Sequence, residues 1–194
     1  MLARLTSAVL VASAGASTLI ACKGSTAENP SARTEWLVDP KTAPIPDAYV
    51  SGQIEGSPVK VRNVSFFSEA DRWDVRIEGS DASSNDVIVN LKLHEPVVAG
   101  KTYVLDRIAA TGTSVDVTDP ATKKNRGESN LTSIIRLQVD RWDAKPYAGH
   151  FDPSAGFASG RIYVGLQSQD GKQGGLAGTF AEAKIGYLAK PPGT

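Results

Sequence analysis

Apolar and polar residues alternate with a period of two along most of the chain after about residue 48. Trp73, Val75 and Ile77 are separated by charged residues, and the same alternation returns in residues 87–93 and 135–140. This pattern is typical of strands that have one face in a core and the other in water. No window after residue 22 sustains the i, i+3, i+4, i+7 spacing of an amphipathic helix. The sequence therefore predicts an all-β protein.

The strands and turns together predict a fold class. The expected strands are residues 48–54, 59–67, 73–78, 87–93, 103–105, 115–117, 135–140, 161–164 and 176–187. About nine strands with short turns between them predict an antiparallel β-sandwich, or a small barrel. The charged segment 119–130 contains no aliphatic residue larger than Ala. We interpret it as a solvated hairpin loop, with a recognition loop as the alternative.

The tetrapeptide Asp-Arg-Trp-Asp occurs twice, around Trp73 and around Trp142. The residues beside the two copies do not align, so we interpret the repeat as a coincidence rather than as a duplicated half-domain. Trp73 shares its face with Val75 and Ile77, which predicts that it belongs to the core. Trp142 has the opposite parity to Val139 unless a bulge intervenes. It is therefore expected to be an exposed or rim aromatic residue.

The first 21 residues have the composition of a cleaved secretory signal. A single basic residue, Arg4, precedes a run of small and apolar residues that carries no charge until Lys23. The run ends in Leu-Ile-Ala-Cys at residues 19–22, which resembles the lipobox of bacterial lipoproteins. The resemblance implies that Cys22 is lipidated, becomes the mature first residue and anchors the protein in a lipid bilayer. Lys23 is not the Asp that retains such proteins in the inner membrane, so the resemblance implies the outer membrane.

Four parts of the chain are expected. Residues 1–21 form the signal peptide, residues 22–47 the lipidated Cys and a flexible tether, residues 48–189 the β-sandwich domain, and residues 190–194 a disordered tail. Within the tether, the apolar tripeptide Trp36-Leu37-Val38 interrupts the polar composition. These three residues are expected to dock on their own domain or, alternatively, on a partner.

Charge and cysteine content exclude several classes of protein. The chain has 21 Lys+Arg and 21 Asp+Glu, and its formal net charge is +0, so nucleic acid is not expected as a partner. The single cysteine, Cys22, leaves no internal disulfide and no multi-thiolate metal site. His94 and His150 are the two histidines of the chain. We expect no cofactor and no resident metal.

The catalytic motifs of known enzyme classes are incomplete in this sequence. Ser57 and Lys60 have the Ser-x-x-Lys spacing, but Pro58 places them in a turn and a strand rather than on one helical face. The glycine-rich residues 171–175 lack the Gly-Lys-[Ser/Thr] ending of a P-loop. His150 and the aspartates near it have no spacing that distinguishes a metal site from a surface loop. No catalytic residue is predicted, and the protein is not expected to be an enzyme.

Four short segments resemble a group of uncharacterised bacterial lipoprotein domains. They are residues 52–56, 96–103, 158–162 and 178–180. In that group, small β-sandwiches carry a Pro-Gly-x-Tyr turn and a closing Gly-Thr-Phe strand. The resemblance covers roughly residues 48–188 and implies a β-sandwich. The group has no established activity, so it implies none for this chain.

A non-catalytic binding or adaptor module for an envelope protein or glycan is the function that these features favour. An inhibitor or immunity lipoprotein against a hydrolase is the alternative, and a hydrolase with an unrecognised carboxylate site is less favoured. Loop 145–152 gathers side chains of the kinds that dominate protein interfaces. Tyr147 and Phe151 could instead fold back and cap the sandwich. The candidate partner-binding residues are Trp142, Lys145, Tyr147, His150 and Phe151.

Overall fold

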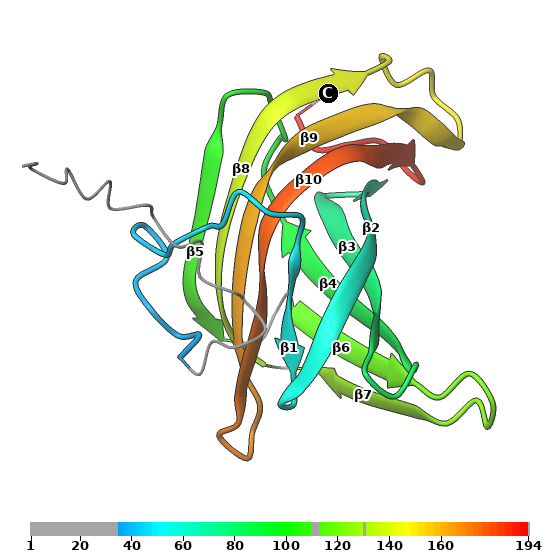
Figure 1. The fold of residues 1–194 in the computed structure, drawn as a ribbon. Coiled ribbons are helices and arrows are strands. Elements are labelled where there is room, and N and C mark those ends of the chain that lie inside the picture. Colours follow the sequence, from blue (N-terminus) through cyan, green and yellow to red (C-terminus); the bar gives the residue numbers. More distant parts are fainter. Residues whose placement is uncertain (1–34, 110–112, 130, 194) are drawn as a thin grey trace, which may run out of the picture.

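Ten β-strands joined by loops make up the fold in the computed structural model, which describes residues 35–109, 113–129 and 131–193 (Figure 1). The expected signal peptide and Cys22 lie outside the described residues. The all-β prediction is confirmed. The strands are β1 (Ser51–Ile54), β2 (Ser57–Glu69), β3 (Arg72–Asp81), β4 (Asp86–Leu93), β5 (Thr102–Ala109), β6 (Thr113–Thr118), β7 (Asn125–Ser129), β8 (Thr132–Ala144), β9 (Asp152–Gln167) and β10 (Gln173–Tyr187).

All ten strands belong to one sheet, in the order β5-β8-β9-β10-β1-β2-β3-β4-β6-β7. Neighbours are antiparallel, except that the end of β10 runs parallel to β2 beyond the short strand β1. The sheet bends so that β8, β9 and β10 face β2, β3 and β4 across the core (Figure 1). It is not closed into a barrel, because the outermost strands β5 and β7 do not pair with each other among the described residues. The two layers of the sandwich-like fold are thus halves of one sheet.

The main core fills the space between the two halves of the sheet. Trp73 lies in it with an exposed fraction of 3%, together with Val75 and Ile77, as the alternation predicts. From the facing half, Ile162 and Ile185 are fully buried in the same cluster. Burying apolar surface is worth about 25 cal/mol per Å². The burial of these side chains between the two halves is therefore the main interaction that keeps the sheet bent.

The position of Trp142 corrects the sequence-based expectation. The pairing of β8 with β9 shifts between Val139 and Arg141, so a β-bulge occupies the intervening position. The bulge reverses the parity of the residues that follow it, and Trp142 turns toward the core. Its ring centroid lies 5.2 Å from that of Phe66 and 5.1 Å from that of Trp73, both in edge-on geometry. Trp142 is therefore partly buried and is not an exposed rim residue.

Residues 35–47, here called the strap, lie against the outer face of the sheet. Trp36 is fully buried there, in a second hydrophobic cluster with Ile134 and Tyr163. The Tyr163 hydroxyl donates a hydrogen bond of 2.9 Å to the Trp36 carbonyl oxygen. Gly175 leaves the space for the indole, since a Cβ at that position would lie 2.3 Å from the ring. Trp36 thus docks on its own domain, and this part of the expected tether is packed rather than flexible.

Strand β7 lies within the segment that the sequence predicted to be a loop. It pairs with β6 through the register Ser114↔Ser129 to Thr118↔Asn125 and forms one edge of the sheet. Residues 120–127 are exposed. A strand at an edge with charged side chains shows no apolar alternation, which is why this tenth strand had no signal in the sequence.

The C-terminal residues also pack on the domain, which corrects the expected disordered tail for residues 190–193. Pro191 is buried, and a Cβ at Gly193 would lie 2.5 Å from Pro96. The Ser68 hydroxyl donates a hydrogen bond of 2.5 Å to the Ala189 carbonyl oxygen. The backbone N–H groups of Leu188 and Ala189 also donate to the Ser68 carbonyl oxygen, so the chain is attached to β2 directly before this tail.

Candidate ligand-binding site

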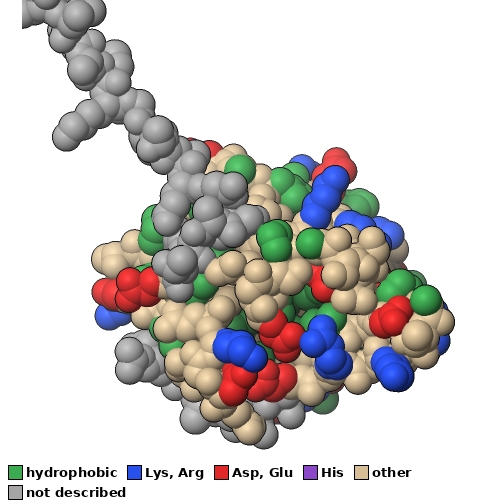
Figure 2. Space-filling view, turned by 60° about the horizontal axis from the view of Figure 1, so that its bottom comes forward, with side chains coloured by type: hydrophobic (Ala, Val, Ile, Leu, Met, Phe, Trp, Pro, Cys, Tyr) green, Lys and Arg blue, Asp and Glu red, His purple; other side chains and the backbone are tan. Residues whose placement is uncertain are grey.

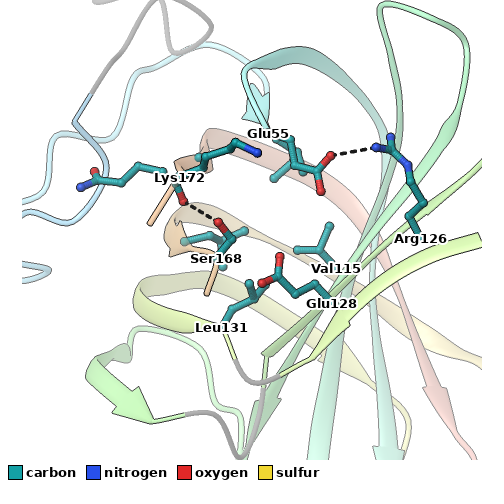
Figure 3. A pocket seen from close by; sticks show the side chains of 11 residues that line it. Glu55, Val115, Arg126, Glu128, Leu131, Ser168 and Lys172 are labelled. Atoms are coloured by element: carbon teal, nitrogen blue, oxygen red, sulfur yellow. Dashed lines mark hydrogen bonds and ion pairs between the residues drawn. The ribbon is translucent and has the colours of Figure 1, made fainter. Parts of the chain in front are cut away.

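One end of the bent sheet is open, and a cavity of about 30 Å³ lies there. The β1–β2 turn, strand β7 and the β9–β10 hairpin surround it (Figure 3). On this measure a water molecule needs about 10–15 Å³, so the cavity has room for the end of a small side chain. Its floor is aliphatic and belongs to the main core. The floor residues, each at most 6% exposed, are Ile54, Val115, Leu131 and Leu166.

Charged side chains form the rim of this cavity, which we call the open-end site. Figure 2 faces this end of the molecule and shows acidic and basic side chains side by side around a hollow with hydrophobic side chains in it. Nη1 of Arg126 lies 3.2 Å from Oε2 of Glu55, so an ion pair joins β7 to the β1–β2 turn. Both side chains are well exposed, and such pairs contribute little to stability. The charged rim residues are Glu55, Arg126, Glu128 and Lys172.

Glu55 has an uncommon backbone conformation. The two central residues of the β1–β2 turn, Glu55 and Gly56, have φ angles of 51° and 76°. Positive φ at both positions is typical of a type I′ hairpin turn, in which Asn, Asp or Gly usually comes first. Five described non-glycine residues have a positive φ, and Glu55 is the one among them that lines the cavity. The turn holds the Glu55 carboxylate at the rim, where Figure 3 shows it directed toward Arg126.

The β9–β10 hairpin supplies a cation, Lys172. Its Nζ lies 2.6 Å from Asp170, which also accepts a hydrogen bond from the Ser168 hydroxyl. These two bonds, that of Lys172 first, lower the pKa of Asp170 to about 2. The hydrogen bond to Asp170 raises the pKa of Lys172, and the more distant carboxylates of Glu55 and Glu128 raise it further. Lys172 is therefore a protonated cation at the mouth of the cavity.

Glu128 brings a carboxylate to the rim from strand β7. Its Oε1 accepts a hydrogen bond of 2.9 Å from the backbone N–H of Gln169, which links β7 to the β9–β10 hairpin. Among the described residues, no Lys, Arg or His nitrogen lies within 4.0 Å of this carboxylate. Figure 3 shows the side chain pointing toward the cavity. Its charge is therefore available to a ligand.

A second, more polar hollow of about 220 Å³ adjoins the first cavity. The two share Ile54, Glu55 and Arg126 in their lining. Asp81 lines the second hollow and accepts hydrogen bonds from the side chain and the backbone N–H of Asn85, both at 2.9 Å. A ligand whose apolar end lies in the first cavity could therefore contact polar groups of the second hollow with its other end.

The strap reaches the open-end site through Gln173. Oε1 of Gln173 accepts hydrogen bonds from the backbone N–H groups of Trp36, at 2.9 Å, and Leu37, at 3.3 Å. Gln173 also lines the cavity. The first described residues of the chain are thus attached to the wall of the site.

The predicted partner-binding loop lies at the opposite end of strand β9 (Figure 1). Trp142 and Tyr147 pack toward the core, and the ring centroid of Tyr147 is 5.5 Å from that of Tyr187. The Tyr187 hydroxyl donates a hydrogen bond of 2.6 Å to the carbonyl oxygen of Lys145. The capping alternative thus applies to Tyr147, whereas Phe151 is 61% exposed. The candidate side chains that remain at the surface are Lys145, His150 and Phe151.

The surroundings of His150 bear on the metal-site alternative. In the ranges that the structure describes, no group of three or more His, Cys, Asp or Glu side chains is placed so as to hold a metal ion. The His150 ring contacts only the carbonyl oxygen of Ala148 among the described hydrogen bonds, at 3.3 Å from Nδ1.

Comparisons with known proteins found no relative of this chain. No family model matches it, and neither the curated proteins nor the solved structures contain a significant match. The fold and the site therefore define the protein only as an all-β domain with a small cavity at the open end of a bent sheet.

Sequence reasoning did not find the open-end site. Its four charged residues come from a turn, an edge strand and a hairpin, and each of these segments has the composition of a solvated surface. One signal was present in the sequence. Glu55-Gly56 occupies a two-residue turn where Asn-Gly or Asp-Gly is the usual pair.

Proposed function

We propose that this protein is a lipid-anchored, non-catalytic binding module of the bacterial outer membrane, with its ligand held at the open-end site. The observation that carries the proposal is the aliphatic floor of the cavity beneath a rim of both charges. Ligand sites typically combine an apolar pocket with a few polar groups that fix orientation. Here the ion pair of Glu55 with Arg126 and the hydrogen bond from the Gln169 N–H to Glu128 connect the segments of the rim.

The lipobox at residues 19–22 supports the anchor. Within the described ranges, the structure contains no helix able to cross a membrane. Cys22 and Glu35 are 35 − 22 = 13 residues apart, which reach at most about 45 Å when fully extended. Because the strap begins at the wall of the site, the ligand we propose is an envelope component within that distance of the membrane surface.

Mass spectrometry of the mature protein tests the anchor. We expect an acylated Cys22 as the first residue and co-fractionation of the protein with the outer membrane. The Cys22→Ser variant should lose the acyl mass and the membrane association together. An unmodified N-terminus at another residue would contradict the proposal.

Site-specific photo-crosslinking in cells tests the location of the binding surface. A photoreactive residue at Glu55 should capture an envelope component, and one at Phe151 should not. Capture should decrease when Glu128 is replaced by Gln, and it should persist in the control Glu182→Gln, which removes an exposed carboxylate elsewhere on β10. Capture from Phe151 alone would show that the binding surface is at the other end of the sheet.

An inhibitor of a periplasmic hydrolase is the second candidate function. It is favoured by Phe151, which is 61% exposed in a loop held by the packing of Tyr147 on Tyr187. A rigid loop with one exposed aromatic side chain is a suitable anchor for a partner's pocket. Co-purification of a hydrolase that is lost in Phe151→Ser and kept in Glu128→Gln would support this function in place of the first.

A further inference from the structure

The charges around the open-end site are unbalanced, although the whole chain has a formal net charge of +0. We count the charged residues that line the two hollows and their ion-pair partners. Two cations stand against four carboxylates, a local excess of two negative charges (2 − 4 = −2). The cations are Arg126 and Lys172, and the carboxylates are Glu55, Asp81, Glu128 and Asp170.

Both cations already have a carboxylate partner. Arg126 is paired with Glu55 at 3.2 Å, and Lys172 with Asp170 at 2.6 Å. Glu128 accepts one hydrogen bond from a backbone N–H, and no cationic group of the described residues lies within 4.0 Å of it. A ligand that brings a positive charge therefore satisfies this carboxylate, whereas a ligand carboxylate would add to the local excess.

The aliphatic floor sets the second requirement on the ligand. Glu128 and the floor residues Val115 and Leu131 line the same cavity and lie close together in Figure 3. A cation at the rim must therefore carry an apolar group on its inner side. The volume of about 30 Å³ limits that group to the end of a small aliphatic side chain.

We infer that the open-end site binds a primary ammonium attached to a small branched aliphatic group. The ammonium lies against Glu128, with Glu55 nearby, and the aliphatic group enters the cavity. The remainder of the ligand extends into the polar hollow beside Asp81. This inference rests on the proposed function, because it specifies the ligand class of the same site. The N-terminal residue of a polypeptide and a free aliphatic amine share this chemistry.

Titrations of the mature chain, solubilised in detergent, test the inference. The probes are L-valinamide, its neutral analogue N-acetyl-L-valinamide, the anion isovalerate and glycinamide, which lacks the side chain. The methyl NMR signals of Ile54, Val115, Leu131 and Leu166 report binding at the cavity. L-Valinamide should shift these signals and bind about tenfold more tightly than the acetylated analogue, since a hydrogen bond to a charged group is lost. Glycinamide should bind about tenfold more weakly, since the apolar contact is lost.

Two variants distinguish an effect of the Glu128 charge on binding from an effect on the fold. Glu128→Gln should remove the preference for the ammonium while keeping an oxygen for the Gln169 N–H. Glu182→Gln, with the same change of charge elsewhere on β10, should keep the preference. The peptide Val-Gly-Gly-amide distinguishes a polypeptide N-terminus from a free aliphatic amine as the ligand. Tighter binding than that of L-valinamide identifies a polypeptide N-terminus, and equal binding identifies a free amine.

Two results would overturn the inference and leave the open-end site as a binding site. One is equal affinity for L-valinamide and its acetylated analogue, and the other is tightest binding of isovalerate. If no probe shifts the four methyl signals, the cavity is not a ligand site. In that case both the inference and the proposed location of binding are wrong.

Discussion

The two ends of the bent sheet are filled by different kinds of side chain. At the end near the β8–β9 loop, aromatic rings pack in T-shaped and tilted pairs between the two halves, with centroid separations of 5.1 to 6.0 Å. At the open end, aliphatic side chains occupy the equivalent space and leave a cavity of about 30 Å³. The rings are those of Trp73, Trp142, Tyr147 and Tyr187, and the aliphatic residues are Ile54, Val115, Leu131 and Leu166.

The difference follows from side-chain size. Aromatic rings bury 150–250 Å² each, and a pair adds about 0.5–1.5 kcal/mol beyond its area, so they fill the aromatic end. Aliphatic side chains do not reach across the open end, where charged residues of a turn, an edge strand and a hairpin form a rim instead. We therefore expect substitutions to cost most stability at the aromatic end and to change ligand binding most at the open end.

Replacement of Trp73 by Ala should have the largest effect on stability. Its side chain is 3% exposed and touches the rings of Trp142 and Tyr187, so the free energy of unfolding should fall by about 3–5 kcal/mol. Trp142→Ala should cost about 2–3 kcal/mol, because this ring is only partly buried. Denaturant titration measures both. A loss below about 1 kcal/mol for Trp142→Ala would mean that the bulge does not turn it inward.

Replacement of Trp36 by Ala tests the strap. Trp36 is fully buried, but its cluster on the outer face is smaller than the main core, so we expect a loss of about 2–4 kcal/mol. The Gln173 side chain should also lose its two backbone partners, and ligand binding at the open end should weaken. Hydrogen exchange of residues 36–45 would show the strap released. Unchanged protection there would contradict the docking.

Replacement of Leu166 by Ala should affect stability less than that of Trp73 and binding more. Leu166 lies in the floor of an existing cavity, so its removal should cost about 2 kcal/mol, the low end for buried leucine. The enlarged cavity should weaken binding of a small branched aliphatic probe. A stability loss equal to that of Trp73→Ala would contradict the difference between the two ends.

Tyr147→Ser and Phe151→Ser should separate the two aromatic residues of the β8–β9 loop. Tyr147 packs on Tyr187, and its loss should cost about 1–2 kcal/mol and lower the thermal midpoint by several degrees. Phe151 is 61% exposed, and its loss should change stability by no more than about 0.5 kcal/mol. Thermal unfolding followed by circular dichroism compares them directly. Equal shifts would show that both residues cap the core.

The smallest expected effect is the pH dependence of stability that Asp170 contributes. Lys172, followed by Ser168, holds the pKa of Asp170 at about 2, below its ordinary value of 3.8. A lowered folded-state pKa means that the stabilising contribution is complete above about pH 4 and is lost as the pH falls through about 2. NMR titration of Asp170 should give this pKa, and Lys172→Gln should raise it toward 3.8. A titration unchanged by Lys172→Gln would contradict the pairing at the open end.

Individual elements show how far the sequence could predict the fold. The alternation around Trp73 correctly predicted strand β3 and the inward direction of its apolar face. Both features depend only on residues that are neighbours in the sequence. Strand β7 had no such signal, since its residues 125–127 are all exposed and it contains no apolar side chain. The docking of Trp36 was expected, but the glycine at position 175 that accommodates its ring has meaning only once β10 is in place.

By itself, the sequence determined the all-β class and the inner face of Trp73, because each is a property of short continuous segments. The tertiary structure alone decided the direction of Trp142, because one bulge residue reverses a strand's parity. It also decided the composition of the open-end site. Glu55 and Arg126 are 71 residues apart, and they meet only because the sheet bends to bury its apolar face.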